Sequence, residues 1–280
     1  QEIPGLKEVH AFDAAGVHTM LLAIGSERYT PYSQTKQPAE ILTIANHILG
    51  TGQLSLAKFL FITADDSNKL SAADIESFFS YILKRINLAR DIHFHTNTTI
   101  DTLDYSGTTL NSGSKVVFAA YGDEIRELDT IIPVGLKNMQ GFENPEIIMP
   151  GVIAIQSKAF TNYENAHKEM EMLNDKCSMF SDQLKNIPMI VICDDAGFVS
   201  EKLNNFLWVT FTRCNPSHDI YGINSFIENK HWGCHGPMVT DARIKPHHAP
   251  AVERDAATEQ KIDRLFEKGG SLYNISASSK

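Results

Sequence analysis

Two short stretches of this sequence share one pattern, an apolar run that closes on paired aspartates. They read LFITADD at residues 60–66 and MIVICDD at residues 189–195, so the aspartates recur 129 residues apart. Apolar runs of this length are typical of central strands that are buried on both faces of a sheet. A chain that carries the pattern twice is expected to contain two copies of one structural unit.

An amphipathic helical pattern follows each apolar run. In the first copy, apolar residues recur at helical spacing at Ile75, Phe78, Phe79, Ile82 and Leu83. An offset of 128 residues leads to Leu203, Phe206, Leu207, Thr210 and Phe211, which are again mostly apolar. The same offset pairs Arg85 with Arg213 and Asp91 with Asp219. Upstream, AIGSERY at residues 23–29 parallels AIQSKAF at residues 154–160. Agreement over several elements favours an internal duplication.

Strands that alternate with helices predict an α/β fold. We expect two similar layered units, each with a largely parallel or mixed sheet and flanking helices. The first unit is predicted at residues 1–135 and the second at residues 151–280. Prolines and glycines between residues 131 and 151 predict a linker at residues 136–150.

Composition excludes several classes of protein. The formal net charge of −9 argues against sequence-independent binding of nucleic acid, which needs a basic surface. No apolar stretch approaches the length that spans a bilayer, and the first residues show no secretory signal. The four cysteines form no C-x-x-C pair, so we expect free thiols and a cytoplasmic location.

The paired aspartates have two interpretations. Two carboxylates could bind Mg²⁺ or act as acid and base. Alternatively, one aspartate caps the following helix while the other is solvated. Adjacent residues leave a strand on opposite faces, which favours the second interpretation.

A group of metal-ligating residue types lies near the C-terminus. It comprises His231, Cys234, His235, His247 and His248, which are residue types that zinc prefers. Their spacing fits no standard zinc finger. His93 and His95 alternate on an expected strand, but two ligands without a third are weak evidence for a metal.

Several segments together resemble the C-terminal region of UbiD-type decarboxylases. One resembles the family's T-R-x-x-P-x-x-D pattern through Thr212, Arg213, Pro216 and Asp219, which the first copy retains as Arg85 and Asp91. Another resembles N-T-P-I-D-x-L-D followed by G-S-K, at residues 97–104 and 113–115. VTDARIKP at residues 239–246 resembles the family's closing pattern.

The resemblance implies a carboxy-lyase that acts on aromatic or α,β-unsaturated acids, of the quinone-pathway type. Its cofactor would be prenylated FMN held with a divalent metal and K⁺. These groups bind mainly to an N-terminal flavin-binding domain that nothing in this sequence matches, so that domain is the expected partner. No catalytic residue and no metal ligand are therefore expected in this chain, which alone would lack the catalytic machinery.

The resemblance also gives roles to individual residues. Ile100, Asp101 and Leu103 would face the substrate, or Ile100 and Leu103 would fill the local core instead. Arg85, Asp91, Arg213 and Asp219 would be structural, and the chain would help to hold a homo-oligomer together.

Three hypotheses for function remain open at this point. The first is the C-terminal part of a UbiD-like decarboxylase, shaping the substrate side of its site. The second is a stand-alone, non-catalytic binding or assembly module of the same fold. The third is a metal-dependent enzyme that uses the C-terminal histidines.

Overall fold

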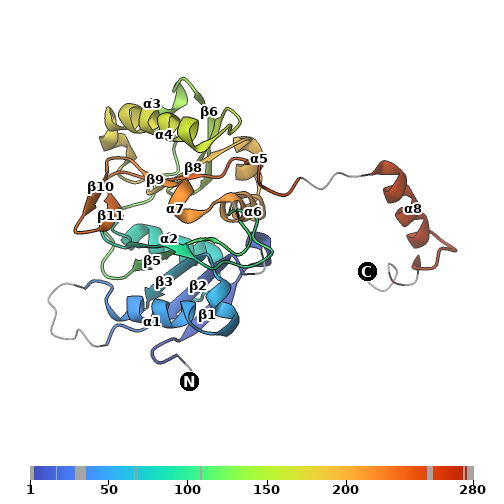
Figure 1. The fold of residues 1–280 in the computed structure, drawn as a ribbon, viewed down its shortest axis with the longest axis horizontal. Coiled ribbons are helices and arrows are strands. Elements are labelled where there is room, and N and C mark those ends of the chain that lie inside the picture. The colour runs from blue at the N-terminus through green and yellow to red at the C-terminus, as the bar shows by residue number, and fades with distance from the viewer. Residues whose placement is uncertain are drawn as a thin grey trace. The chain divides into compact units, whose positions relative to one another are not determined.

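The computed structural model describes residues 3–16, 18–28, 36–65, 67, 69–107, 109–250, 255–273 and 275. The chain separates into two compact units, Gln1–His248 and Ala249–Lys280. Within the described residues, no helix is long and apolar enough to cross a membrane. Both five-stranded sheets lie in the larger unit (Figure 1).

The first half of the larger unit is built on a five-stranded mixed sheet in the order β1-β2-β3-β5-β4. Its strands are β1 (Glu8–Ala11), β2 (Met20–Gly25), β3 (Phe59–Ala64), β4 (Ile92–Thr98) and β5 (Gly113–Ala120). Its helices are η1 (Asp13–Ala15), α1 (Glu40–Leu49), η2 (Gly52–Leu56) and α2 (Ile75–Arg85). The middle strands β2, β3 and β5 run parallel, while β1 and β4 are antiparallel edge strands.

The second half contains another five-stranded mixed sheet, in the order β6-β7-β8-β12-β9. Its strands are β6 (Phe142–Met149), β7 (Val152–Ser157), β8 (Met189–Cys193), β9 (Ile220–Gly222) and β12 (Met238–Asp241). Its helices are α3 (Val134–Lys137), α4 (Tyr163–Ser178), η3 (Ser181–Leu184), α5 (Ala196–Glu201), α6 (Leu203–Arg213) and α7 (Pro216–Asp219). A separate hairpin of β10 (Ser225–Glu228) and β11 (His231–Cys234) lies between β9 and β12.

The two sheets share one topology. In the second sheet β7, β8 and β12 are parallel, and β6 and β9 are antiparallel edges, which repeats the first sheet strand for strand. The predicted α/β class with two similar mixed sheets is therefore confirmed. The hairpin has no counterpart in the first half among the described residues, where the segment between β4 and β5 forms no hairpin of named strands.

Helices α2 and α6 lie between the two sheets and join them through one core (Figure 1). Both helices have 11 residues. All five positions of the sequence pattern are buried in α2, and four of the five are buried in α6, where Leu203 is partly buried. On the outer side of the first sheet, α1 buries its apolar face. On the outer side of the second sheet, α4 does the same.

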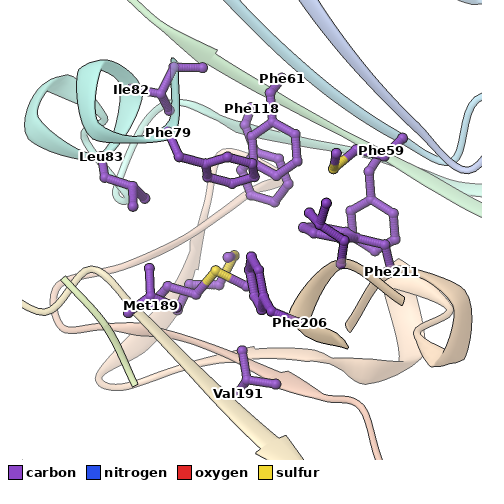
Figure 2. Close-up of a cluster of buried hydrophobic side chains, with 14 of the residues drawn as sticks. Phe59, Phe61, Phe79, Ile82, Leu83, Phe118, Met189, Val191, Phe206 and Phe211 are labelled. Carbon is purple, nitrogen blue, oxygen red and sulfur yellow. The ribbon is translucent and has the colours of Figure 1, made fainter. Parts of the chain in front are cut away.

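Phenylalanines from both halves meet at the centre of this core (Figure 2). The Phe211 ring of α6 packs edge-on against Phe59 of β3, with 4.9 Å between ring centroids. Phe61 stacks on Phe118 at 4.5 Å, and Phe79 of α2 approaches Phe206 of α6 at 6.2 Å. Such aromatic contacts add to the free energy gained by burying the rings. The two halves therefore pack on each other.

The strands differ from the sequence alignment by one residue. The paired aspartates align Leu60 with Met189, yet Leu60 faces the outer core and Met189 faces the central core. An alignment of the two strands by their first residues pairs Phe59 with Met189 instead, and both of these side chains face the central helices. A shift of one residue moves a side chain to the other face of a sheet.

The predicted linker at residues 136–150 contains regular structure. Strand β6 lies within it and forms the edge of the second sheet, paired with β7. At the other end of the chain, Ala249–Lys280 forms its own compact unit. There α8 (Ala256–Phe266) begins after Asp255, whose side chain accepts a hydrogen bond from the Ala257 N–H, and it buries none of its residues. The predicted domain boundaries at 135 and 151 remain a prediction.

The shared core predicts that both halves unfold together. Phe211→Ala should lower the free energy of unfolding by about 3–5 kcal/mol, because it leaves a cavity between the two sheets. Urea denaturation followed by circular dichroism measures this loss. Phe198→Ala, at a ring that is 40% exposed, is the control and should cost roughly 1 kcal/mol. Two separate transitions in the wild-type chain would contradict the shared core.

Candidate functional site

The segment after β4 contains the three residues predicted to face a substrate, and Asp101 anchors it. Asp101 Oδ2 lies 2.5 Å from His18 Nδ1, and Oδ1 accepts a hydrogen bond of 3.0 Å from the Leu103 N–H. The hydrogen bond from Leu103 and the contact with His18 lower the pKa of Asp101, although partial burial opposes them. Asp101 therefore fixes the turn instead of presenting a free carboxylate.

A buried lysine contacts the same segment. Lys58, just before β3, is 1% exposed, and its Nζ lies 2.8 Å from Asp104 Oδ2. The ammonium also donates a 2.8 Å hydrogen bond to Ser106 Oγ. His247 Nε2 approaches the Ser106 carbonyl oxygen at 3.2 Å from the second half. Lys58 belongs to no motif, and its one signal in the sequence is its place directly before the apolar run.

The two remaining substrate-facing candidates differ in exposure. Ile100 is 2% exposed and packs so closely on Gly113 that a Cβ there would lie 2.9 Å from Ile100 Cδ1. Leu103 is 72% exposed. Ile100 thus fills the local core, while Leu103 projects from a turn whose backbone is held by Asp101. Leu110, later in the same segment, is also exposed.

Two of the segments that carry the family resemblance, residues 113–115 and 212–219, meet across the halves. The Ser114 hydroxyl donates a 2.5 Å hydrogen bond to Asn215 Oδ1. Ser114 Oγ in turn accepts a 2.8 Å hydrogen bond from the Ser217 N–H. Both Ser114 and Asn215 are buried. A buried polar pair of this kind requires each partner, because an unpaired polar group would lose its hydration without compensation.

A matching turn follows α2 and α6. In the first half the Asn87 N–H donates to Asp91 Oδ2 at 2.9 Å, and the Asp91 N–H returns a 2.8 Å bond to the Asn87 carbonyl. In the second half Asn215 and Asp219 make the same two bonds, at 2.6 and 2.9 Å. Both aspartates are fully buried. The same turn after each helix explains why Arg85 and Arg213 are each followed by an aspartate six positions later.

Asp91 and Asp219 have different counter-charges. Arg90 lies 2.5 Å from Asp91, and burial nevertheless raises the pKa of Asp91. Lys245 Nζ lies 3.3 Å from Asp219 Oδ1 without hydrogen-bond geometry, so Oδ1 accepts no hydrogen bond from a described residue. Burial raises the pKa of Asp219 to about 7, against the effect of Lys245.

A second buried network of ion pairs lies at the end of β12, close to Lys245 in the sequence. Arg243, which is fully buried, donates to both carboxylate oxygens of Asp241, at 2.9 and 2.7 Å. It also donates a 2.6 Å hydrogen bond to Glu169 of α4. Removal of one partner from such a network leaves a buried charge uncompensated. The segment that resembles the family's closing pattern therefore ties β12 to α4.

The repeated arginines make unlike contacts. Arg85 lies over the Tyr81 ring, donates to the Gly122 carbonyl and pairs with Glu124 at 3.1 Å. Arg213 lies over the Trp208 ring and pairs with Asp194 at 3.1 Å. Both stabilise the ends of their helices, but the partners are not equivalent.

The paired aspartates have structural contacts. Asp65 accepts hydrogen bonds from the N–H groups of Ser67, Lys69 and Leu70. Burial would raise its pKa, but these bonds and the Ser67 hydroxyl lower it to about 2. Asp195 caps α5 by accepting from the Phe198 N–H, as predicted, whereas Asp194 pairs with Arg213 and is not simply solvated. Asp66 lies outside the described residues.

The candidate zinc residues do not gather in one place. His231, Cys234 and His235 lie in or beside the hairpin, where His235 stacks on Phe226, while His247 and His248 lie beyond β12. Within the part of the chain that the structure describes, three or more potential metal ligands nowhere come together. The zinc site predicted as the third hypothesis therefore lacks its ligand set. All four cysteines are free and buried.

The Lys58–Asp104 pair predicts a stability effect. Lys58→Met should lower the free energy of unfolding by about 3–5 kcal/mol, because Asp104 is left buried without a counter-charge. Adding Asp104→Asn should restore part of that loss, as measured by urea denaturation. Lys84→Met removes a more exposed pair with Glu124 and should change stability by about 0.5 kcal/mol or less. Equal losses for the two single variants would contradict the assignment.

Two histidines predict loss of stability in acid. Burial, with His231, His95 and Arg90 nearby, lowers the pKa of His93 to about 4, and burial beside Lys245 lowers that of His248 to about 3. Histidine in an unfolded chain titrates near 6.5, so the unfolded state takes up protons first. Stability should therefore fall as the pH drops from about 6.5 to about 4.

Urea denaturation at several pH values checks this expectation. His93→Phe removes one of the two groups, so its stability should depend less steeply on pH between about 6.5 and 4. An unchanged slope in that variant would contradict the role of His93.

Comparison with known proteins supports the resemblance. Residues 1–120 match the family model described as the 3-octaprenyl-4-hydroxybenzoate carboxy-lyase C-terminal domain, UbiD_C. A protein of Chlamydia pneumoniae that is named as a subunit of 4-hydroxybenzoate decarboxylase is 31% identical over 269 residues, which cover 94% of this chain and 41% of the relative. An uncharacterized protein of Chlamydia trachomatis serovar D is 32% identical over 263 residues, 93% of this chain and 41% of that protein.

Among solved structures, the chain is similar to the UbiD-class enzyme HmfF from Pelotomaculum thermopropionicum in complex with FMN. The TM-score is 0.34 at 14% identity, with 48% of this chain and 28% of that chain covered. This chain spans about two fifths of the length of the curated relatives that it matches. The resemblance drawn from the sequence is confirmed, and residues 1–120 belong to the family of UbiD C-terminal domains.

Proposed function

We propose that this chain is the C-terminal part of a UbiD-like, prenylated-FMN-dependent decarboxylase of aromatic or unsaturated acids, of the quinone-pathway type. The observation that carries the proposal is the family match over residues 1–120, which include the anchored segment at Ile100–Asp104. The name of the Chlamydia pneumoniae relative supports decarboxylation as the reaction class.

The contribution of this chain is to shape the substrate side of the site. Leu103 supports this role because it is exposed on a turn that Asp101 and Asp104 hold in place. A side chain whose backbone is fixed before binding loses less conformational entropy when it meets a ligand. An apolar side chain suits the ring or unsaturated chain of such an acid. Ile100 would support this turn from within the core.

The flavin, its divalent metal and K⁺ fit poorly on the described residues alone. No group of three potential metal ligands forms there. Lys84 and Arg85, which line a cleft of 670 Å³ between α2 and α5, are both paired with Glu124. We therefore propose that an N-terminal flavin-binding domain, as the partner of this chain, holds these groups and the catalytic residues.

We infer in addition that the halves descend from one duplicated unit. Identical strand order and direction, two matching 11-residue helices and the two Asn-x-x-x-Asp turns support the inference. The same reasoning assigns Arg85, Asp91, Arg213 and Asp219 structural roles. We propose finally that the chain helps to hold a homo-oligomer together in the cytoplasm.

The substrate-facing role predicts an effect on catalysis. In the full-length protein loaded with its flavin, Leu103→Ala should lower kcat/KM for an aromatic acid about tenfold or more, because apolar contact with the substrate is lost. Steady-state decarboxylation assays measure this ratio. Leu110→Ala, at a similarly exposed leucine of the same segment, is the matched control and should leave kcat/KM unchanged.

Two outcomes would contradict the proposal. Equal effects of the two leucine variants would remove the specific role of Leu103. Absence of decarboxylation by the full-length protein with bound flavin would favour a non-catalytic binding or assembly module of the same fold instead.

A further inference from the structure

A cleft lies where the hairpin of the second half meets edge strand β4 of the first half. Hairpin strand β11 contacts β4, and the Cys234 N–H donates a 3.1 Å hydrogen bond to the Leu88 carbonyl. The cleft has a volume of 500 Å³, which is in the range of sites for small molecules. None of the described residues that line it belongs to the segment at residues 99–112.

One part of the cleft wall is aromatic and aliphatic. The Trp232 ring packs edge-on against Phe94, with 5.4 Å between centroids. Ile92 and Ile220 line the same cleft from β4 and β9, and Ile227, which is 76% exposed, lines it from the hairpin. A flat apolar molecule could cover these side chains and remove apolar surface from water.

The polar groups of the cleft include two facing imidazoles. The His93 and His231 rings lie 5.5 Å apart. His231 Nε2 is buried and has no hydrogen-bond partner among the described residues, which is costly unless a ligand or water supplies one. Lys230 lies in the lining next to His231. The pKa of His93 is about 4, so its ring is neutral at pH 7.

The charge of the cleft is opposite to that of the chain. The chain carries a formal net charge of −9, yet the described residues that line this cleft include no aspartate or glutamate. Asp91, whose charge acts on His231, is buried and already paired with Arg90. Glu228 faces His231 across the hairpin register but is exposed and does not line the cleft. A small anion would therefore meet Lys230 and the imidazoles without a competing carboxylate.

We propose that this cleft binds a small aromatic carboxylate. Its ring packs against Phe94 and Trp232, and its carboxylate accepts hydrogen bonds from His231 Nε2–H and Lys230 Nζ. The site is built from both halves, so it exists only when they are packed together. It is independent of the proposed decarboxylase function, and either can fail without the other.

Tryptophan fluorescence provides a local test. The chain has two tryptophans, so Trp208→Phe leaves Trp232 in the cleft wall as the sole reporter. Titration of this variant with benzoate should give saturable quenching. Benzyl alcohol tests the need for the carboxylate, and acetate tests the need for the ring. Neither should bind at the concentrations at which benzoate saturates.

Variants at the cleft decide where the ligand binds. Lys230→Gln and His231→Phe, each in the Trp208→Phe background, should weaken benzoate binding about tenfold, because each removes one hydrogen bond to a charged group. Glu228→Gln is the matched control in the same hairpin and should bind benzoate equally well or more tightly. Thermal melts by circular dichroism check that each variant is folded, and the exposed Lys230 keeps the test valid if His231→Phe unfolds.

Three results would overturn the proposal. One is the absence of saturable quenching by benzoate at millimolar concentration. Another is equal binding of benzyl alcohol or acetate, which would make the ring or the carboxylate irrelevant. The third is benzoate binding that Lys230→Gln does not weaken in the folded protein.

Discussion

The apolar contact between α2 and α6 and the two sheets is the constraint on which the rest of this structure depends. Phe59, Phe61, Phe79 and Phe118 of the first half share one buried cluster with Phe206 and Phe211 of the second (Figure 2). Each sheet uses one face for this cluster and the other for its own outer helix, α1 or α4. Polar contacts also join the halves, among them Ser114 with Asn215 and Ser106 with His247.

Buried charges determine where the segment between β4 and β5 lies. Lys58 and Asp104 are both withdrawn from water, so each depends on the other more than a surface pair would. Asp101 is held by His18 and by the turn itself. The described residues of this segment lie outside the named strands, so side-chain contacts fix it, and an exposed leucine keeps a defined position. In the second half, the network of Asp241, Arg243 and Glu169 likewise fixes the end of β12 against α4.

The sequence predicts the helices of this fold better than its strands. Amphipathic spacing places α2 and α6 correctly because a helix that is buried on one side repeats its apolar residues about every 3.6 positions. Strands β3 and β8 are buried on both faces, so their apolar runs carry no alternation that fixes the register. The alignment of the two aspartate pairs is wrong by one residue for that reason. The hairpin of β10 and β11 also escaped prediction, since its charged and aromatic residues alternate weakly.

The site could be predicted only in part. Asp101 and Asp104 stand out through the family pattern, but their partners His18 and Lys58 are distant in sequence and have no motif.

The core shared by the two halves also matters during synthesis of the chain. The central face of the first sheet has left the ribosome roughly 90 residues before α6 is complete, a delay of about 5–20 seconds at ordinary rates of translation. During that interval α2 already packs on Phe61 through Phe79, but Phe59 and Phe61 still lack their contacts with Phe211, so part of this apolar face stays exposed until α6 is made.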